Sequence, residues 1–432
     1  MKKTYEKSEA LLARARKVTP LGSQTYSKSI RYFCEGAAPA FLERGQGSHV
    51  WDVDGNEFVD FMCALGPVTV GYNDPQVNAA VAGQLQKGIS FSMATELEVE
   101  LAETLTRIVP CAEMVRFVKN GSDATSSAVR LARAFTERDI VAVCGYHGMQ
   151  DWYIGSTTNR RGIPADVCAL THTFVYNDIV SLKQLFAQYP GQIAAVIMEP
   201  IQADGPQDGY LAAVRKVTRE EGALLIFDEV VSGFRYALGG ASELYNVTPD
   251  LAAFGKGMGN GLPISAVAGR ADVMELIGTQ GVFISTTFGG ETLSMAGTMA
   301  TLKILSQPGI YERIWKLGTR LLDGLRAAIV RHGVSEVVKV SGLAPHGGVS
   351  FEGKGSLDYL DMLSIYQQRM VERGILTTGI NNISVAHTEE DIDQFIAAAD
   401  AAFADIRRAL DQNSLTGILH ACKVNPIFKR NK

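Results

Sequence analysis

A lysine set among glycines is the first residue whose surroundings suggest chemistry. Lys256 stands in the run FGKGMG, residues 254–259, where the glycines let the backbone approach a ligand closely. A lysine that forms a Schiff base must be partly desolvated, so that its neutral amine is available. On its own, the segment fits an ordinary solvated loop lysine better than a catalytic one.

A carboxylate pair supplies the second candidate group. The apolar run ALLIF, residues 223–227, ends in Asp228 and Glu229. In open α/β sheets, ligands bind beyond the carboxyl ends of the strands. An ionised carboxylate there could pair with a pyridinium nitrogen, keep it protonated and so maintain the ring as an electron sink. The alternative for Asp228 is an N-capping acid at the start of a helix.

Two glycine-containing segments could bind phosphate. The run NGSDAT, residues 120–125, follows a candidate strand and opens a helix that extends to Ala134. The free N–H groups and the positive end of such a helix form a phosphate cup, although strand–Gly-Ser–helix junctions are common. The run STTFGG, residues 285–290, offers hydroxyls and glycine N–H groups as a second phosphate contact, or is an ordinary turn.

An aromatic side chain could complete the set. In CGYHG, residues 144–148, Tyr146 stands beside glycine at a strand end and could stack on a flat ring. The alternative is a core tyrosine with a hydrogen-bonded histidine. The run MEP, residues 198–200, ends another strand at the same expected edge of the sheet. Together these segments supply a phosphate cup, a stacking ring, a carboxylate and a nucleophilic lysine, which one cofactor would need.

The elements that must position these residues alternate between strands and helices. Short apolar runs, as expected for parallel strands covered on both faces, occur at Val115–Val118, Ile140–Cys144, Ala194–Met198, Leu224–Phe227 and Ala266–Ala268. Between them lie helices such as Thr95–Ile108, in which Thr95 and Glu98 make a capping box. This alternation predicts an α/β fold with a doubly wound core.

The two ends of the chain have a different pattern. Residues 40–61 look like antiparallel hairpins, and long helices are expected over Tyr311–His332 and Asp391–Leu410. We therefore expect residues 62–310 to form a large α/β domain. Residues 1–61 and 311–432 would build a smaller α+β domain, in which Asn413–Lys432 is a tail without a clear pattern.

Composition excludes several classes of function. The chain has 432 residues and a net charge of −5 without a long basic run, so we expect neither a nucleic-acid nor a membrane partner. No signal peptide and no apolar stretch of membrane-spanning length is evident. The six cysteines are scattered, which predicts no metal site, no disulfide framework and a reducing, cytoplasmic location.

From about residue 10 to about residue 410, the chain resembles the class III aminotransferases of the fold type I pyridoxal-phosphate superfamily. The resemblance rests on GSDATSSAVRLARA, CGYHG, IMEP, LIFDEVVSGFR, TPDLAAFGKGMGNGLPISAVAGR, TTFGG and AHTEEDID. It implies pyridoxal 5′-phosphate as cofactor and a fold with a large domain, built on a mostly parallel doubly wound sheet. A smaller α+β domain would come from the N- and C-terminal segments.

The resemblance also implies roles for residues around the cofactor ring. Lys256 matches the lysine that carries the cofactor as a Schiff base. Asp228 matches the aspartate on the pyridine nitrogen. Val230 matches the residue that packs on one ring face, and Tyr146 the aromatic that stacks on the other.

At the phosphate end, Gly121 and Ser122 match the phosphate-binding turn. Thr287 matches a threonine that reaches the phosphate from the neighbouring subunit. The resemblance therefore implies a homodimer with shared active sites.

Within the class, the chain is most similar to the subgroup around glutamate-1-semialdehyde aminomutase, with two departures. Where the aminomutases have Leu-Ser-Gly-Asn-Pro after the phosphate threonine, this chain has FGGET, residues 288–292. The aminomutase segment Asn-Ser-Pro-Val-Arg, which handles the substrate carboxylate, is YSKSIR here, residues 26–31. These changes resemble a branch that aminates sugars, including the 8-amino-3,8-dideoxyoctulosonate transaminases of lipopolysaccharide synthesis. The expected donor is L-glutamate, and the expected acceptor is a keto or aldehyde sugar or sugar acid.

Other functions stay open at this point. An aminomutase, decarboxylase or transaminase acting on an amino acid would use the same fold. A catalytically silent sugar- or cofactor-binding scaffold would have no chemical need for Lys256 and Asp228. A nucleotide-binding protein using the Gly121-Ser122 turn would lack both a Walker lysine pattern and a Gly-x-Gly-x-x-Gly fingerprint.

Overall fold

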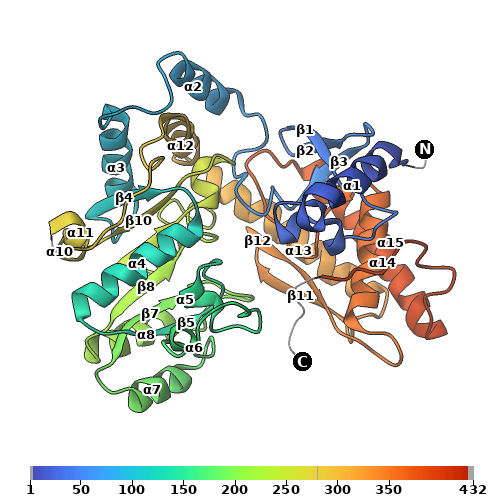
Figure 1. Ribbon diagram of the computed structural model, residues 1–432. Helices are drawn as coiled ribbons and strands as arrows, with labels where there is room; N and C mark the ends of the chain where they lie inside the picture. The colour runs from blue at the N-terminus through green and yellow to red at the C-terminus, as the bar shows by residue number, and fades with distance from the viewer. Residues whose placement is uncertain (1–2, 280, 427–432) are drawn as a thin grey trace. The chain divides into compact units, whose positions relative to one another are not determined.

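The structure is a computed structural model that describes residues 3–279 and 281–426. The chain divides into two compact units, each drawn in Figure 1. The first comprises residues 1–66, 70–74 and 312–432, and the second residues 67–69 and 75–311. Of the tail expected over Asn413–Lys432, residues 427–432 lie outside the described residues.

The second unit, hereafter the large unit, is built around seven strands. They are β4 (Met114–Val118), β5 (Ile140–Cys144), β6 (Thr171–Thr173), β7 (Ile193–Met198), β8 (Leu224–Asp228), β9 (Leu251–Phe254) and β10 (Ser265–Gly269). Its longer helices are α2 (Pro75–Leu85), α3 (Glu96–Ile108), α4 (Gly121–Thr136), α7 (Ile179–Gln188), α8 (Tyr210–Glu220) and α12 (Thr292–Leu305). The shorter ones are α5 (Asp151–Ile154), α6 (Ala165–Cys168), α9 (Gly240–Leu244), α10 (Ala271–Met274), α11 (Leu276–Thr279) and a 3₁₀ turn at Lys256–Gly259.

The sheet is mostly parallel, with one strand reversed. The strand order is β4-β10-β9-β8-β7-β5-β6. Pairing is parallel from β9 through β8, β7 and β5 to β6, whereas β10 runs antiparallel to both of its neighbours. The expectation that Ala266–Ala268 is a parallel strand is therefore wrong. An apolar run indicates burial on both faces but carries no information about strand direction.

Both faces of the sheet are covered, which explains the continuous apolar runs. In β5, Val141 and Val143 pack in the same apolar cluster as Ala128 and Leu131 of α4, which crosses the strands in Figure 1. The intervening residues of β5 point to the other face, where the cluster includes Leu182 of α7 together with side chains of α8. Alternating side chains of one strand thus bury both faces at once.

The helix starts follow local capping rules. Thr95 and Glu98 form the expected capping box at α3, in which Glu98 accepts a hydrogen bond from the Thr95 N–H at 2.9 Å. Asn120 caps α4, because its side-chain oxygen accepts from the Asp123 N–H at 3.0 Å. These caps fix where each helix begins.

The first unit, hereafter the small unit, contains the chain ends. Its strands are β1 (Leu42–Gln46), β2 (His49–Asp52), β3 (Glu57–Asp60), β11 (Val338–Leu343), β12 (His346–Phe351) and β13 (Ile375–Leu376). Its helices are α1 (Glu6–Val18), α13 (Ile310–Arg331, in this unit from residue 312), α14 (Tyr359–Glu372) and α15 (Glu389–Gln412), with 3₁₀ turns at Pro20–Gly22, Tyr26–Lys28 and Ile30–Tyr32. The hairpins expected over residues 40–61 are present as β1, β2 and β3, which pair antiparallel. Over the residues described, no helix combines the length and apolar character needed to cross a membrane.

Candidate active site

The strand directions gather the predicted residues at one edge of the large sheet. Strands β5, β7, β8 and β9 are mutually parallel. Because β10 is antiparallel to both β9 and β4, the strand β4 also points the same way. The segments that begin with Gly121, Tyr146, Glu199 and Lys256, and Asp228 at the end of β8, therefore share the carboxyl edge, where open α/β sheets bind ligands.

Asp228 is held in place by two hydrogen bonds. Its Oδ2 lies 2.8 Å from Nδ1 of His147, and its Oδ1 accepts the Val230 N–H at 3.1 Å. Asp228 and His147 are both buried. The His147 ring also stacks on Trp152, with ring centres 6.4 Å apart. The structure thus supports the hydrogen-bonded histidine that the sequence left as an alternative, and this histidine fixes the orientation of the carboxylate.

Lys256 follows β9, the neighbour of β8 in the sheet, and begins a 3₁₀ turn with a positive φ of 36°. Burial lowers the pKa of its amine, and the negative charges of Asp228 and Glu199 partly oppose that shift. Within the described residues, its amine makes no hydrogen bond or ion pair. A desolvated amine without a partner has the character expected of a nucleophilic lysine.

Glu199 is a site residue to which the sequence analysis gave no role. Its Oε2 accepts the Tyr146 N–H at 3.0 Å. An added Cβ on Gly145, which has a φ of +115°, would lie 2.5 Å from the same oxygen, so this approach requires glycine. Burial raises the pKa of the Glu199 carboxyl, and the negative charge of Asp228 raises it further. The only sequence signal was its place after a strand at the predicted edge.

The phosphate-cup turn packs tightly against its neighbours. An added Cβ on Gly121 would lie 2.9 Å from Cγ1 of Val230, so the first turn of α4 and Val230 are in close contact. The Ser122 hydroxyl accepts the Met149 N–H at 3.1 Å. Gly148 leaves room for that hydroxyl, since a Cβ there would come within 2.2 Å of it. The geometry brings Gly121, Ser122 and Val230 together.

The second carboxylate of the pair, Glu229, has a structural role. It is fully buried and accepts hydrogen bonds from the Ala241 N–H and from the Ser242 N–H and hydroxyl, each at 2.9 Å. The Ser232 hydroxyl donates to it as well, at 2.5 Å. Glu229 thus fixes the start of α9 and leaves Asp228 as the carboxylate available at the sheet edge.

Two predicted site residues lie exposed. The side chain of Tyr146 is 55% exposed and meets Tyr153 edge-on, with ring centres 5.6 Å apart. Thr287 is exposed at the start of a turn over residues 287–290. In the part of the chain that the structure describes, Thr287 makes no hydrogen bond to the other predicted site residues.

The arrangement fits pyridoxal phosphate. The N-terminus of α4 has free N–H groups and the Ser122 hydroxyl, which would suit a phosphate. The buried Asp228 carboxylate would suit a ring nitrogen, and the desolvated Lys256 amine would suit an aldehyde. A separate hollow of about 730 Å³ beside α4, with Ser126, Arg130 and Phe283 in its walls, includes neither Lys256 nor Asp228.

Comparison with known proteins identifies the class. Residues 33–398 match the model of the class III aminotransferases, so the chain belongs to this family. A curated relative, the glutamate-1-semialdehyde 2,1-aminomutase of Roseiflexus castenholzii, is 38% identical over 94% of this chain and 99% of its own length.

Solved structures agree with this assignment. The FumI protein of Sphingopyxis sp. MTA144 has a TM-score of 0.86 at 31% identity, covering 94% of this chain and 98% of its own. An omega-transaminase from Sphaerobacter thermophilus has a TM-score of 0.84 at 29% identity, covering 93% and 98%. The fold is that of the fold type I pyridoxal-phosphate transferases, and the chain is a pyridoxal-phosphate-dependent enzyme that transfers amino groups.

Proposed function

We propose that this enzyme transfers the amino group of L-glutamate to the carbonyl carbon of a sugar acid, with Lys256 as its catalytic lysine. The catalytic assignment rests on the positions of Asp228 and Lys256 at the ends of two adjacent strands. At the end of β8, Asp228 is buried and fixed by His147; at the end of β9, Lys256 is desolvated. A fixed carboxylate and an available amine are the two groups that this chemistry requires.

The other site residues at the sheet edge would bind the ring and the phosphate of the cofactor. Asp228 would hold the ring nitrogen in its protonated form, and Val230 and Tyr146 would bound the two ring faces. Gly121 and Ser122 would bind the phosphate at the N-terminus of α4. When bound, pyridoxal phosphate supplies an electron sink for the carbanion that forms when the substrate loses a proton.

Lys256 would act as both the attachment point and the proton carrier. Its Nζ would form the covalent bond that holds the cofactor. When the amine of the donor takes that place, the same Nζ would be free to accept the proton from the substrate carbon and to return it. The lowered pKa of Lys256 favours this role, because the amine must be neutral to accept a proton.

We further propose a homodimer in which Thr287 reaches the phosphate of the neighbouring subunit. Near Thr287, the apolar side chains of Phe283 and Phe288 are 74% and 55% exposed. Exposed apolar residues gathered in one segment are typical of an interface. Sedimentation analysis tests the dimer. If Thr287→Ala weakens pyridoxal-phosphate binding without changing the sedimentation coefficient, the shared site is supported.

The sugar-acid acceptor is supported by the 26–31 segment. Lys28 and Arg31 are exposed there, in place of the aminomutase pattern, and can bind a carboxylate. The departure at residues 288–292 has a structural explanation instead. Glu291 caps α12 by accepting the Leu293 N–H at 2.7 Å, so this change does not discriminate between substrates. Formation of 8-amino-3,8-dideoxyoctulosonate for lipopolysaccharide, in the cytoplasm, fits this proposal.

The second candidate is glutamate-1-semialdehyde 2,1-aminomutase activity. The 38% identity to the Roseiflexus castenholzii protein favours it. An aminomutase moves the amino group within one molecule, so it forms no 2-oxoglutarate. Incubation with glutamate 1-semialdehyde, followed by analysis of 5-aminolevulinate, tests this alternative directly.

The test of the proposed function is an absorption spectrum of the purified protein with pyridoxal phosphate, before and after L-glutamate. We expect a band at roughly 410–420 nm to give way to one near about 330 nm, with release of 2-oxoglutarate. Lys256→Ala should lack both the first band and turnover, whereas the exposed Lys183→Ala in α7 should retain both. Turnover by Lys256→Ala would refute the assignment.

A further inference from the structure

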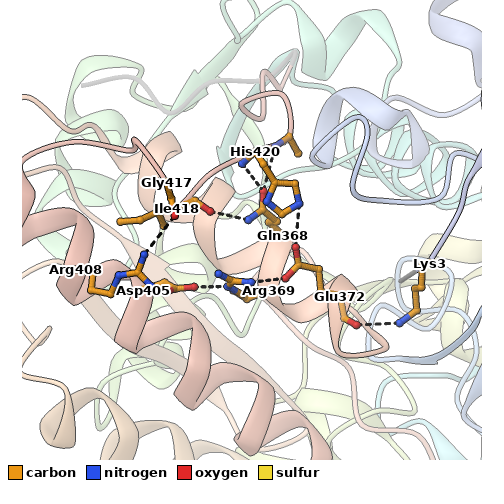
Figure 2. A network of polar contacts seen from close by, with 10 residues as sticks. Lys3, Gln368, Arg369, Glu372, Asp405, Arg408, Gly417, Ile418 and His420 are labelled. Carbon is orange, nitrogen blue, oxygen red and sulfur yellow. Dashed lines mark hydrogen bonds and ion pairs between the residues drawn. The ribbon is translucent and has the colours of Figure 1, made fainter. Parts of the chain in front are cut away.

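Buried side chains hold backbone segments outside the helices and strands in both units. In the small unit, Gln368 of α14 is completely buried and binds the tail after α15 through three hydrogen bonds (Figure 2). Its Nε2 donates to the Ile418 carbonyl at 3.0 Å, and its Oε1 accepts the N–H groups of His420 and Ala421 at 3.0 and 3.1 Å. A buried amide that satisfies three backbone groups fixes the local path of the chain.

The tail also binds an early segment of the chain. The Cys422 N–H donates to the Glu35 carbonyl at 3.1 Å, and the Asn425 N–H donates to the Arg31 carbonyl at 3.2 Å. These bonds order two stretches of backbone within the small unit, so their role is structural.

In the large unit, the same kind of restraint acts on one peptide group at the candidate active site. The Tyr153 hydroxyl donates to the Gly145 carbonyl at 2.7 Å, and Glu199 Oε2 accepts the Tyr146 N–H at 3.0 Å. This carbonyl and this N–H belong to the same peptide bond, which joins Gly145 to Tyr146. Because the two polar groups of a trans peptide point in opposite directions, the two hydrogen bonds fix the plane of this peptide from both sides.

Gly145 makes the contact with Glu199 possible. It has a φ of +115°, and an added Cβ would lie 2.5 Å from Glu199 Oε2 and 2.9 Å from Gln202 Nε2. A side chain at this position would therefore displace the carboxylate that accepts the Tyr146 N–H.

The ring of Tyr153 contacts two residues of the site at once. It meets the Tyr146 ring edge-on with centres 5.6 Å apart, and the His147 ring with centres 5.2 Å apart. Tyr153 is buried, and burial together with the negative charge of Glu199 raises the pKa of its hydroxyl. The hydroxyl therefore stays protonated and remains a donor to the Gly145 carbonyl. Tyr153 thus restrains the predicted stacking ring and the histidine that holds Asp228.

The preceding residue of α5 reaches the phosphate-cup turn. Trp152 Nε1 donates to the Ser126 hydroxyl at 2.8 Å, and that hydroxyl donates to the Ser122 carbonyl at 2.6 Å. The Trp152 ring also stacks on His147. The short helix α5 is therefore connected to the segment of Tyr146 and His147 and to the turn at Ser122.

We propose that Tyr153 is a positioning residue that sets the angle of the Tyr146 ring against the cofactor, an inference that rests on the proposed function. The Tyr146 side chain is 55% exposed, so packing covers only part of its ring. Its backbone, by contrast, is held on both sides by Tyr153 and Glu199. A fixed backbone limits the directions in which a side chain can project, and this lowers the entropy that is lost when the ring stacks on a ligand. Tyr146 contacts the cofactor, and Tyr153 acts through Tyr146.

The test replaces Tyr153 by phenylalanine, which keeps the ring and removes only the hydroxyl. The full-length apoprotein is titrated with pyridoxal phosphate to obtain Kd, and the ratio of visible circular dichroism to absorbance reports how the bound cofactor is oriented. We expect Kd to rise roughly two- to tenfold in Tyr153→Phe, and the dichroism ratio to change. Tyr189→Phe is the matched control, because Tyr189 stacks on His172 at the end of α7, and it should change neither quantity.

A double-mutant cycle determines whether Tyr153 acts through Tyr146. Tyr146→Leu by itself should raise Kd and change the dichroism ratio. In the Tyr146→Leu background, Tyr153→Phe should add nothing further to either quantity. Hydrogen exchange of the peptide 144–150 in the apoprotein provides a readout that does not depend on the cofactor, and it should be faster in Tyr153→Phe than in the wild type.

The outcomes separate the inference from the proposed function. An unchanged Kd and dichroism ratio in Tyr153→Phe would overturn the positioning role, even if the variant unfolds at a lower urea concentration. An equal effect of Tyr153→Phe in the wild-type and Tyr146→Leu backgrounds would overturn it as well. If Tyr146→Leu itself left both quantities unchanged, the stacking role of Tyr146 in the proposed function would be refuted, and the inference with it.

Discussion

Nδ1 of His147 lies 2.8 Å from Oδ2 of Asp228, and the two side chains come from different strand ends of the large sheet. His147 follows β5 and Asp228 ends β8, with β7 between these strands. The hydrogen bond therefore joins segments that only the sheet brings together. It gives the carboxylate one orientation, which the proposed pairing of Asp228 with a ring nitrogen would require.

Adjacent carboxylates should respond differently to loss of charge. Asp228→Asn should lower kcat about 100-fold or more, because the ring nitrogen loses its counter-ion, and should change stability little. Glu229→Gln places an NH₂ group against the N–H donors at the start of α9 and should cost about 2–4 kcal/mol of unfolding free energy. Urea titrations and steady-state rates of the two variants measure both effects. A stable, active Glu229→Gln would contradict the structural role.

The charge of Glu199 should control the protonation of Lys256. Glu199 raises the pKa of Lys256 against the larger, opposite effect of burial. Removing that charge in Glu199→Gln should therefore move the labelling midpoint of Lys256 to lower pH. Trinitrobenzenesulfonate labelling of the apoprotein, followed peptide by peptide, reports this midpoint, and exposed Lys183 is the internal control. A midpoint that stays in place or rises would refute the coupling.

A methyl group on Gly121 should weaken cofactor binding. The added Cβ would lie 2.9 and 3.0 Å from the two methyl carbons of Val230. Overpacking of this kind costs about 1–3 kcal/mol, so Kd for pyridoxal phosphate should rise roughly 5- to 150-fold if that cost falls on the bound state. Gly83→Ala in α2 is the control, because its Cβ meets nothing within 4 Å. Fluorescence titration should show unchanged affinity in that control.

Stability should fall in mild acid because of His387. This buried imidazole accepts the Ser384 N–H at 3.0 Å, and burial lowers the pKa of His387 to about 4. The unfolded chain, with a histidine pKa near about 6.5, takes up the proton first. Stability is therefore lost as pH falls from about 6.5 towards 4, by up to about 3 kcal/mol. His387→Asn keeps an acceptor without a basic group, so its unfolding free energy should depend less on pH over this range.

Much of the central sheet could be predicted because its strands are buried on both faces. The expected strands at Ile140–Cys144 and Ala194–Met198 match β5 and β7 to within one residue. The direction of β10 was predicted wrongly, since the reversal depends on its two neighbours and not on its own residues. The capping box at Thr95 was recognisable because capping is local.

The contacts between distant segments were harder to anticipate. The hydrogen-bond partner of His147 could not be predicted until β5 and β8 were placed in one sheet. Glu199 received no role because its partner, Tyr146, lies far from it in the sequence. The tail had no pattern because its order comes from Gln368, a residue 50 positions before Ile418. The proposed roles of Lys256, Asp228 and Thr287 remain predictions for the experiments above.

The hydrogen bond between Asn425 and Arg31 joins an early part of the chain to a late one. At about 5–20 residues per second, the ribosome makes Asn425 on the order of tens of seconds after Arg31. A nascent chain can fold its central sheet during this interval, but residues 31 and 35 obtain their hydrogen bonds to Asn425 and Cys422 only after those residues have been made. A protein truncated before residue 413 would therefore leave the carbonyls of Arg31 and Glu35 without these two hydrogen bonds, so the local order of an early segment depends on a late one.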